Sequence, residues 1–242
     1  MLWEIVDTPH RLLGSFHALR KESVWPEWVE AGCQGITRFV FESDMRSIPT
    51  AQILTIGIDP CLEHKKLRGA TTAYQRANTL LESIGSTSKL DIYLPWRAAQ
   101  ILAATFMPKH GFFHARGVDT ILREKAERQK CDLGFLSSPT RSSELMQLAC
   151  EITDFGMKLF EETITDIESG GDIKELNRLY RAWLLSDLKD LTAYLNESLG
   201  KFPSIYEAST IQRNREWVTV ARLMAAKPNP TLFVMGSLVV PI

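Results

Sequence analysis

The alternation of short apolar runs with helix-forming segments is the feature that most limits the fold of this sequence. Residues 11–15 and 36–42 are rich in apolar, β-branched and aromatic side chains and predict two strands, with a short helix beginning near Pro26 between them. A helix from Gly117 and a third such run at residues 131–136 continue the pattern. This order is typical of a sheet covered by helices. We therefore expect an α/β fold, with some α+β character, in which helices flank a central β-sheet.

The C-terminal half is mostly helix-forming sequence. Its leucines and aromatic residues recur at helical spacing, which indicates a core-facing stripe. The predicted helices cover residues 142–166, 172–199 and 204–226. We expect one domain over residues 1–242, made of a sheet-rich half (1–136), a helical part (137–227) and a returning strand (228–242).

Composition excludes several functional classes. The net charge is −1, which gives no field for nucleic acid, and no apolar run is long enough for a membrane span. There is no Walker loop and no Gly-x-Gly-x-x-Gly, so no nucleotide cofactor is expected. The N-terminus lacks a signal-peptide pattern, which predicts a cytoplasmic protein and leaves a specialised export route open. The oligomeric state stays open.

Polar side chains follow two predicted strands that we expect to be neighbours in the sheet. His17 comes just after the first strand, and Glu42 and Asp44 lie at the end of the second. Imidazole and carboxylate together suit a divalent metal ion. We expect His17 and Glu42 to be metal ligands, and Glu42 and Asp44 to be the carboxylates that act in catalysis, with Asp44 as a general base.

Several short motifs, in a fixed order along the chain, resemble those of the TraB/GumN (Tiki-like) family, whose better-studied members are metal-dependent peptidases. The resemblance implies a divalent ion (Mn, Co or Zn), a peptide or protein substrate or partner, an Arg213 that stabilises an oxyanion and an Asn214 that orients it. The similar segments are Gly14-x-x-His17, the strand ending at Glu42, Leu94-Pro95-Trp96, Gly117-Val118-Asp119, Arg213-Asn214 with Trp217, and residues 233–238.

The sequence also departs from the family pattern. Where the family has the histidine of a second Gly-x-x-His, this chain has Val239, and Leu136 stands where many members have glutamate. Gln212 replaces the acidic residue that often precedes Arg-Asn. Two hypotheses follow. One is a metal-dependent peptidase-like hydrolase with a partly degraded site, and the other is an inactive relative that binds a peptide or protein, as a regulatory protein or a subunit.

Overall fold

The structure is a computed structural model that describes residues 1–49, 55–59, 61–151, 155–201 and 203–237. The chain forms two compact units. The first comprises Met1–Ser47, Gly111–Arg141 and Arg178–Ile242, and the second comprises Ile48–His110 and Ser142–Asn177. None of the helices in the described ranges has the length and apolar character that a membrane crossing requires.

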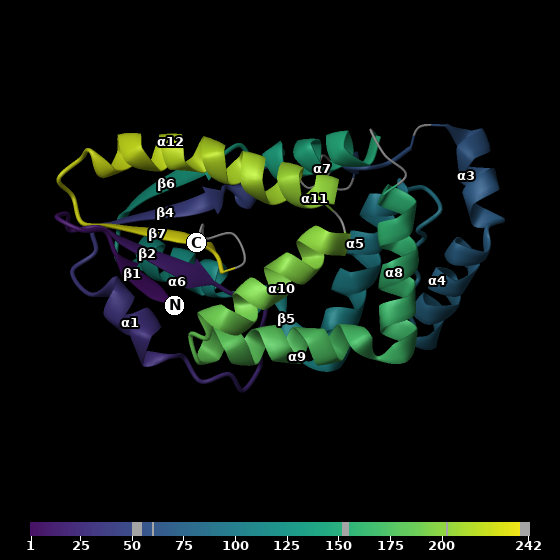
Figure 1. The fold of residues 1–242 in the computed structure, drawn as a ribbon, viewed down its shortest axis with the longest axis horizontal. Helices are drawn as coiled ribbons and strands as arrows, with labels where there is room; N and C mark the ends of the chain where they lie inside the picture. Colours follow the sequence, from purple (N-terminus) through teal and green to yellow (C-terminus); the bar gives the residue numbers. More distant parts are fainter. Residues whose placement is uncertain (50–54, 60, 152–154, 202, 238–242) are drawn as a thin grey trace. The chain divides into compact units, whose positions relative to one another are not determined.

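A five-stranded sheet forms the centre of the first unit, in the order β1-β2-β7-β4-β6 (Figure 1). β1 is antiparallel to β2, whereas β2, β7, β4 and β6 run parallel to one another. The carboxyl ends of these four strands therefore lie at one edge of the sheet. This mixed sheet with flanking helices confirms the expected α/β class. The strands are β1 (Leu2–Glu4), β2 (Arg11–Ser15), β4 (Arg38–Ser43), β6 (Asp132–Ser137) and β7 (Thr231–Gly236).

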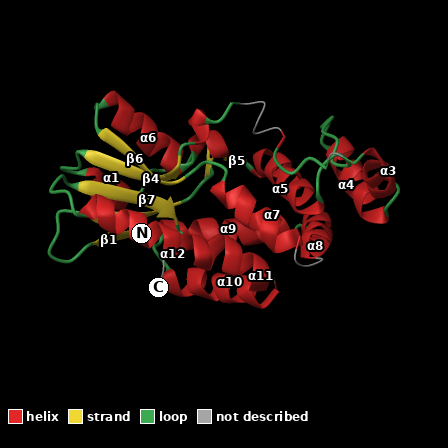
Figure 2. Ribbon diagram, turned by 90° about the horizontal axis from the view of Figure 1, so that it is seen from above, coloured by secondary structure: helices red, strands yellow, loops and turns green. Residues whose placement is uncertain are grey.

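The central strands are apolar because both faces of the sheet are covered. β7 is buried at every residue, and Phe39, Val40 and Phe41 of β4 are buried consecutively. α12 (Arg213–Ala225) packs on the face that Val40 and Phe233 share, and Figure 2 shows α6 (Val118–Arg128) on the opposite side of the strands. The two helices thus cover opposite faces of the sheet.

A second, two-stranded sheet pairs β3 (Leu19–Arg20) with β5 (Phe112–Phe113). Phe112 packs among aromatic side chains that include Phe16 and Tyr180, and the Arg20 guanidinium lies 4.9 Å from the Phe112 ring centroid. This pairing fixes the chain that follows β2. Among the described residues, 3-10 turns occur at η1 (Met45–Ser47), η2 (Met107–His110) and η3 (His114–Arg116).

The C-terminal helices are shorter than the sequence predicts. The segment expected as one helix over 172–199 is divided, because Ser186 adopts a positive φ of 54° and Asp187 accepts a hydrogen bond from the Asp190 amide at the start of the next helix. A π-helical turn, η4, precedes α12 and interrupts the third predicted helix. The helices are α7 (Arg141–Glu151), α8 (Phe155–Ser169), α9 (Gly171–Leu184), α10 (Leu188–Lys201), α11 (Pro203–Tyr206) and η4 (Glu207–Gln212).

The second unit is helical. Its core brings together Tyr74, Leu102 and Phe160, all fully buried, from three different helices. Gly57 adopts a positive φ of 73°, and a Cβ there would lie 2.6 Å from the Cβ of Arg97, so this position requires glycine. The other helices in the described ranges are α1 (Glu27–Cys33) in the first unit and α3 (Leu62–Gly69), α4 (Thr72–Ser83) and α5 (Pro95–Phe106) in the second.

Candidate functional site

Two strand ends bring His17 and Glu42 together. His17 follows β2 by two residues, and Glu42 is the next-to-last residue of β4. The two strands are not the neighbours that were expected, because β7 lies between them. Both run parallel to β7, so their carboxyl ends still meet at the same edge of the sheet. The Nε2 atom of His17 lies 3.9 Å from Oε1 of Glu42. The two side chains expected as metal ligands therefore face each other.

Asp119 holds the other side of the His17 ring. Its Oδ1 lies 3.1 Å from Nδ1 of His17, and the amide of Val118 donates to the carbonyl of Phe16 at 2.9 Å. The start of α6 can lie this close to His17 because Gly117 has no side chain. A Cβ at this position would lie 2.5 Å from the His17 carbonyl oxygen. With its proton on Nδ1, the neutral ring presents the Nε2 lone pair towards Glu42.

No site role was predicted for Asp119. In the sequence, Asp119 is an acidic residue near the N-terminus of a predicted helix, where the helix dipole favours a negative charge. The Gly117-Val118-Asp119 block was the available signal, because a glycine directly before a helix permits a close backbone approach. The partner of Asp119, His17, lies 102 residues earlier in the chain and could not be named from spacing.

The electrostatics of the site favour a charged His17. Burial opposes protonation of the ring, but the hydrogen bond to Asp119 and the negative charges of Glu42 and Asp119 outweigh it and raise the pKa of His17 to about 9. The His17 side chain is 49% exposed, so solvent screens part of this effect. In the metal-free protein at neutral pH, an imidazolium therefore faces the Glu42 carboxylate.

Arg213 supplies a second positive charge to the site. It begins α12, and its guanidinium carbon lies 4.5 Å from the centroid of the Trp217 ring. Burial lowers the pKa of Arg213 from its ordinary value, and the charge of Glu42 opposes that shift. Arg213 in turn lowers the pKa of His17, so the guanidinium acts electrostatically on both facing residues. The oxyanion-stabilising role expected for Arg213 stays a prediction.

Asn214 faces a different environment from its neighbour. It lines a cavity of about 230 Å³ between α12 and the sheet. The other walls are apolar and include Leu12, Trp217 and Met235. The role expected for Asn214, orienting Arg213, stays a prediction.

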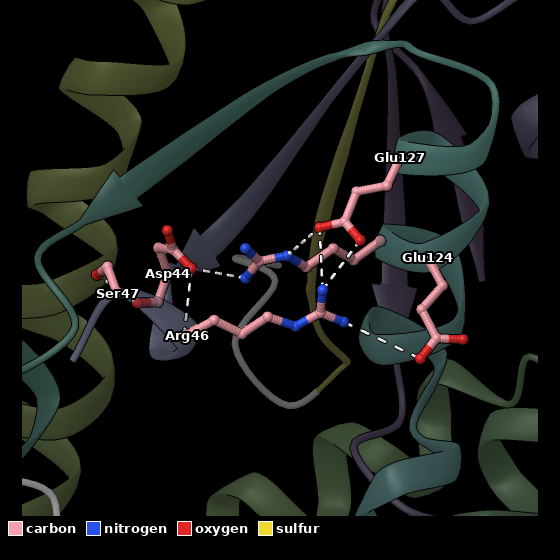
Figure 3. A network of polar contacts seen from close by, with 6 residues as sticks. Asp44, Arg46, Ser47, Glu124 and Glu127 are labelled. Carbon is pink, nitrogen blue, oxygen red and sulfur yellow. Dashed lines mark hydrogen bonds and ion pairs between the residues drawn. The ribbon is translucent and has the colours of Figure 1, made fainter. Parts of the chain in front are cut away.

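Asp44 joins a network of ion pairs beside the site (Figure 3). Its Oδ1 accepts hydrogen bonds from Nη1 of Arg123 at 2.7 Å and from the amide of Arg46 at 3.2 Å. Among the described contacts, none joins the Asp44 carboxylate to His17 or Glu42. The general-base role expected for Asp44 stays a prediction, and the geometry pairs this carboxylate with the Arg123 guanidinium.

The end of β7 also contributes to the site. The amide of Gly236 donates to Oε1 of Glu42 at 2.6 Å, and the amide of Ser237 donates to the carbonyl of Ser15 at 2.8 Å. The glycine of the incomplete second Gly-x-x-His motif thus fixes the Glu42 carboxylate. Val239 lies outside the described residues.

The other two departures from the family pattern have definite locations. Leu136 is buried in the core that α12 makes with the sheet, where it packs with Val40 and Trp217. Gln212 closes the π-helical turn directly before Arg213. Turns of this type are often found at functional sites.

The donor chemistry at this edge fits a weakly held metal ion. In the described ranges, no group of three or more His, Cys, Asp or Glu side chains has the geometry to hold a metal ion. His17 Nε2 and Glu42 Oε1 are nonetheless nitrogen and oxygen donors that face each other, and Asp119 on Nδ1 is the outer partner that ligand histidines usually have. Two donors leave several positions of an ion open to water or substrate.

Comparison with known proteins agrees with these motifs. No curated protein and no solved structure shows significant similarity to the chain. The sequence profile of the TraB/PrgY/gumN family matches residues 1–241, which is nearly the whole length. The chain therefore belongs to the TraB/PrgY/gumN family.

Proposed function

We propose that this protein is a metal-dependent, peptidase-like hydrolase with a reduced metal site. The approach of His17 Nε2 to Glu42 Oε1, with Asp119 on the opposite ring nitrogen, is the observation that supports this function best. His17 and Glu42 would hold Mn²⁺, Co²⁺ or Zn²⁺. Such an ion, when bound, polarises a carbonyl and lowers the pKa of water towards neutrality.

The surrounding residues have separate roles in this proposal. Asp119 keeps the Nδ1 proton of His17 in place, so that Nε2 is directed at the site. The Gly236 amide holds one oxygen of Glu42, which leaves its second oxygen free to accept a proton from a nucleophilic water. The Arg213 guanidinium stabilises the negative charge that develops on a peptide carbonyl oxygen during attack.

A second candidate, favoured by a specific observation, is a binding protein without catalysis. The described part of the chain offers no third metal-ligating side chain at this site, and the raised pKa of His17 favours an imidazolium that Glu42 and Asp119 already neutralise. In that case the edge of the sheet recognises a peptide or protein, with Arg213 as an anion-binding group.

Metal binding tests the first candidate. We would add Mn²⁺, Co²⁺ or Zn²⁺ to chelator-stripped protein and follow the melting temperature. A ligand of the folded state at 100 times its Kd stabilises by about 2.7 kcal/mol. We expect a rise in the wild type that His17→Ala and Glu42→Ala both abolish. His64→Ala is the matched control, since His64 also pairs with a carboxylate, Asp59, but lies in the second unit.

Peptide assays then separate the two candidates. A wild type stabilised by a metal through His17 and Glu42 should cleave members of a peptide library, and Arg213→Gln should lower kcat more than it changes KM. A protein that no metal stabilises, but that binds library peptides without cleaving them, would exclude the hydrolase and support the binding protein.

A further inference from the structure

One face of α6 contacts the two segments that follow β2 and β4, the strands that carry the site. Asp119, Arg123 and Glu127 are spaced four residues apart, so their side chains line one stripe of the helix. This stripe lies beside a buried one, which fixes the helix against the core. The buried stripe consists of Val118, Leu122 and Ala126.

Each residue of the polar stripe has a partner outside the helix. Asp119 contacts His17 beyond the end of β2, and Arg123 donates to Asp44 beyond the end of β4. Glu127 receives two hydrogen bonds from Nη1 of Arg46, at 2.9 and 3.0 Å. Figure 3 shows the part of this network between β4, η1 and α6. A single helix therefore holds the segments that follow β2 and β4.

Arg123 is the most constrained member of the network. Its side chain is 15% exposed, and its Nε donates to Glu127 at 3.1 Å while Nη1 donates to Asp44 at 2.7 Å. The guanidinium carbon also lies 5.4 Å from the centroid of the Phe135 ring. Two hydrogen bonds and a ring contact hold the planar guanidinium in one orientation, which a lysine ammonium would not reproduce.

We propose that Arg123 and Asp44 are positioning residues that hold Glu42 opposite His17. Asp44 is two residues beyond Glu42, so fastening its carboxylate to α6 fixes the end of β4. The distance between Asp119 and Arg123 along the helix is about 6 Å, and it is set by a rigid hydrogen-bonded backbone. Because β7 separates β2 from β4, the two strand ends are not paired directly, and α6 sets their relation from one side.

The Gly236 amide provides a metal-free test. Its hydrogen bond to Glu42 Oε1 reports where that carboxylate lies. If Arg123→Gln or Asp44→Asn releases the end of β4, exchange of the Gly236 amide with solvent should accelerate roughly tenfold or more. The double variant should add little, because both changes break the same link. The rate is taken relative to the buried Val234 amide of the same strand, which corrects for changes in global stability.

Two further variants test whether the effect of Arg123→Gln comes from lost positioning, from the lost charge or from a general loosening of α6. Arg123→Lys keeps the charge, and we expect it to resemble Arg123→Gln because the two-pronged contact is lost. Lys125→Gln breaks another ion pair of α6, with Glu30 on α1, and should leave the Gly236 rate unchanged. The proposal would be overturned if the Gly236 amide of Arg123→Gln exchanged at the wild-type rate. It would also be overturned if Lys125→Gln accelerated that exchange as much as Arg123→Gln does.

The consequence for metal binding rests on the proposed function. If the wild type binds a metal through His17 and Glu42, Arg123→Gln should raise the Kd for that metal roughly tenfold. This is the size of effect that typically follows the loss of a residue supporting a metal ligand. A wild type that binds no metal would refute the proposed function while the exchange result still decides the positioning role. Metal binding in the wild type with no change in Arg123→Gln would count against the positioning role alone.

Discussion

Replacing Gly117 by alanine tests the closest backbone approach at the site. Gly117 has φ −56° and ψ 148°, a conformation that alanine adopts without strain. The added Cβ would lie 2.5 Å from the carbonyl oxygen of His17 and 2.8 Å from its carbonyl carbon. Both are backbone atoms, so no side-chain rotation relieves the contact.

The cost follows from how far the two segments must separate. An ordinary contact to carbon is about 3.5 Å, so the start of α6 must move by about 1 Å. The hydrogen bond from the Val118 amide to Phe16 and the contact between Asp119 and His17 span the same gap. Overpacking costs about 1–3 kcal/mol and a lost hydrogen bond about 1 kcal/mol. We expect the free energy of unfolding to fall by about 2–4 kcal/mol.

Urea denaturation followed by circular dichroism measures this difference. Gly200→Ala is the matched control, because Gly200 lies in α10 and a Cβ there meets nothing within 4 Å. That control should match the wild type or gain up to about 1 kcal/mol from helix propensity. A Gly117→Ala protein within about 0.5 kcal/mol of the wild type would refute the close approach.

Two further predictions concern stability. Arg68 donates to Asp59 and, with a backbone amide and an imidazole, lowers the Asp59 pKa from 3.8 to about 2, so the stability this group contributes is complete above pH 3.8 and is lost as the pH falls through 2. Asp59→Asn should therefore reduce the loss of stability between pH 4 and pH 2 in urea melts, and an unchanged acid dependence would contradict the pairing. His10 accepts from the Thr231 amide at 3.2 Å and donates to the Ala225 carbonyl at 2.8 Å. His10→Ala should cost about 3 kcal/mol in thermal unfolding, and a loss below about 1 kcal/mol would show that these buried bonds contribute little.

The central strands and most helices could be predicted from the sequence because their signals are local. The apolar runs at residues 11–15 and 36–42 correspond to β2 and β4 within a few residues, and the returning strand expected within 228–242 corresponds to β7. Helix breaks were harder. The break at Ser186 lies inside an unbroken apolar stripe and has no glycine or proline to mark it.

His17 and Glu42 were expected together at the ends of two neighbouring strands, and they do face each other, but the strands are not neighbours because β7 lies between β2 and β4. Family resemblance supplied the roles expected of these two residues. The placement of Asp44 could not be foreseen, because its partner, Arg123, is 79 residues away and nothing in the local pattern of either residue selects the other.

The sequence by itself therefore determined the fold class, the main strands and the family, because hydrophobic periodicity and short motifs act over a few residues. Tertiary structure alone decided that Asp119 orients His17, that the Gly236 amide holds Glu42, and that Asp44 pairs with a cation. Each of these contacts joins residues at least 79 positions apart. Such pairs form only when packing of the whole chain brings their elements within hydrogen-bond distance, and no local propensity specifies that distance.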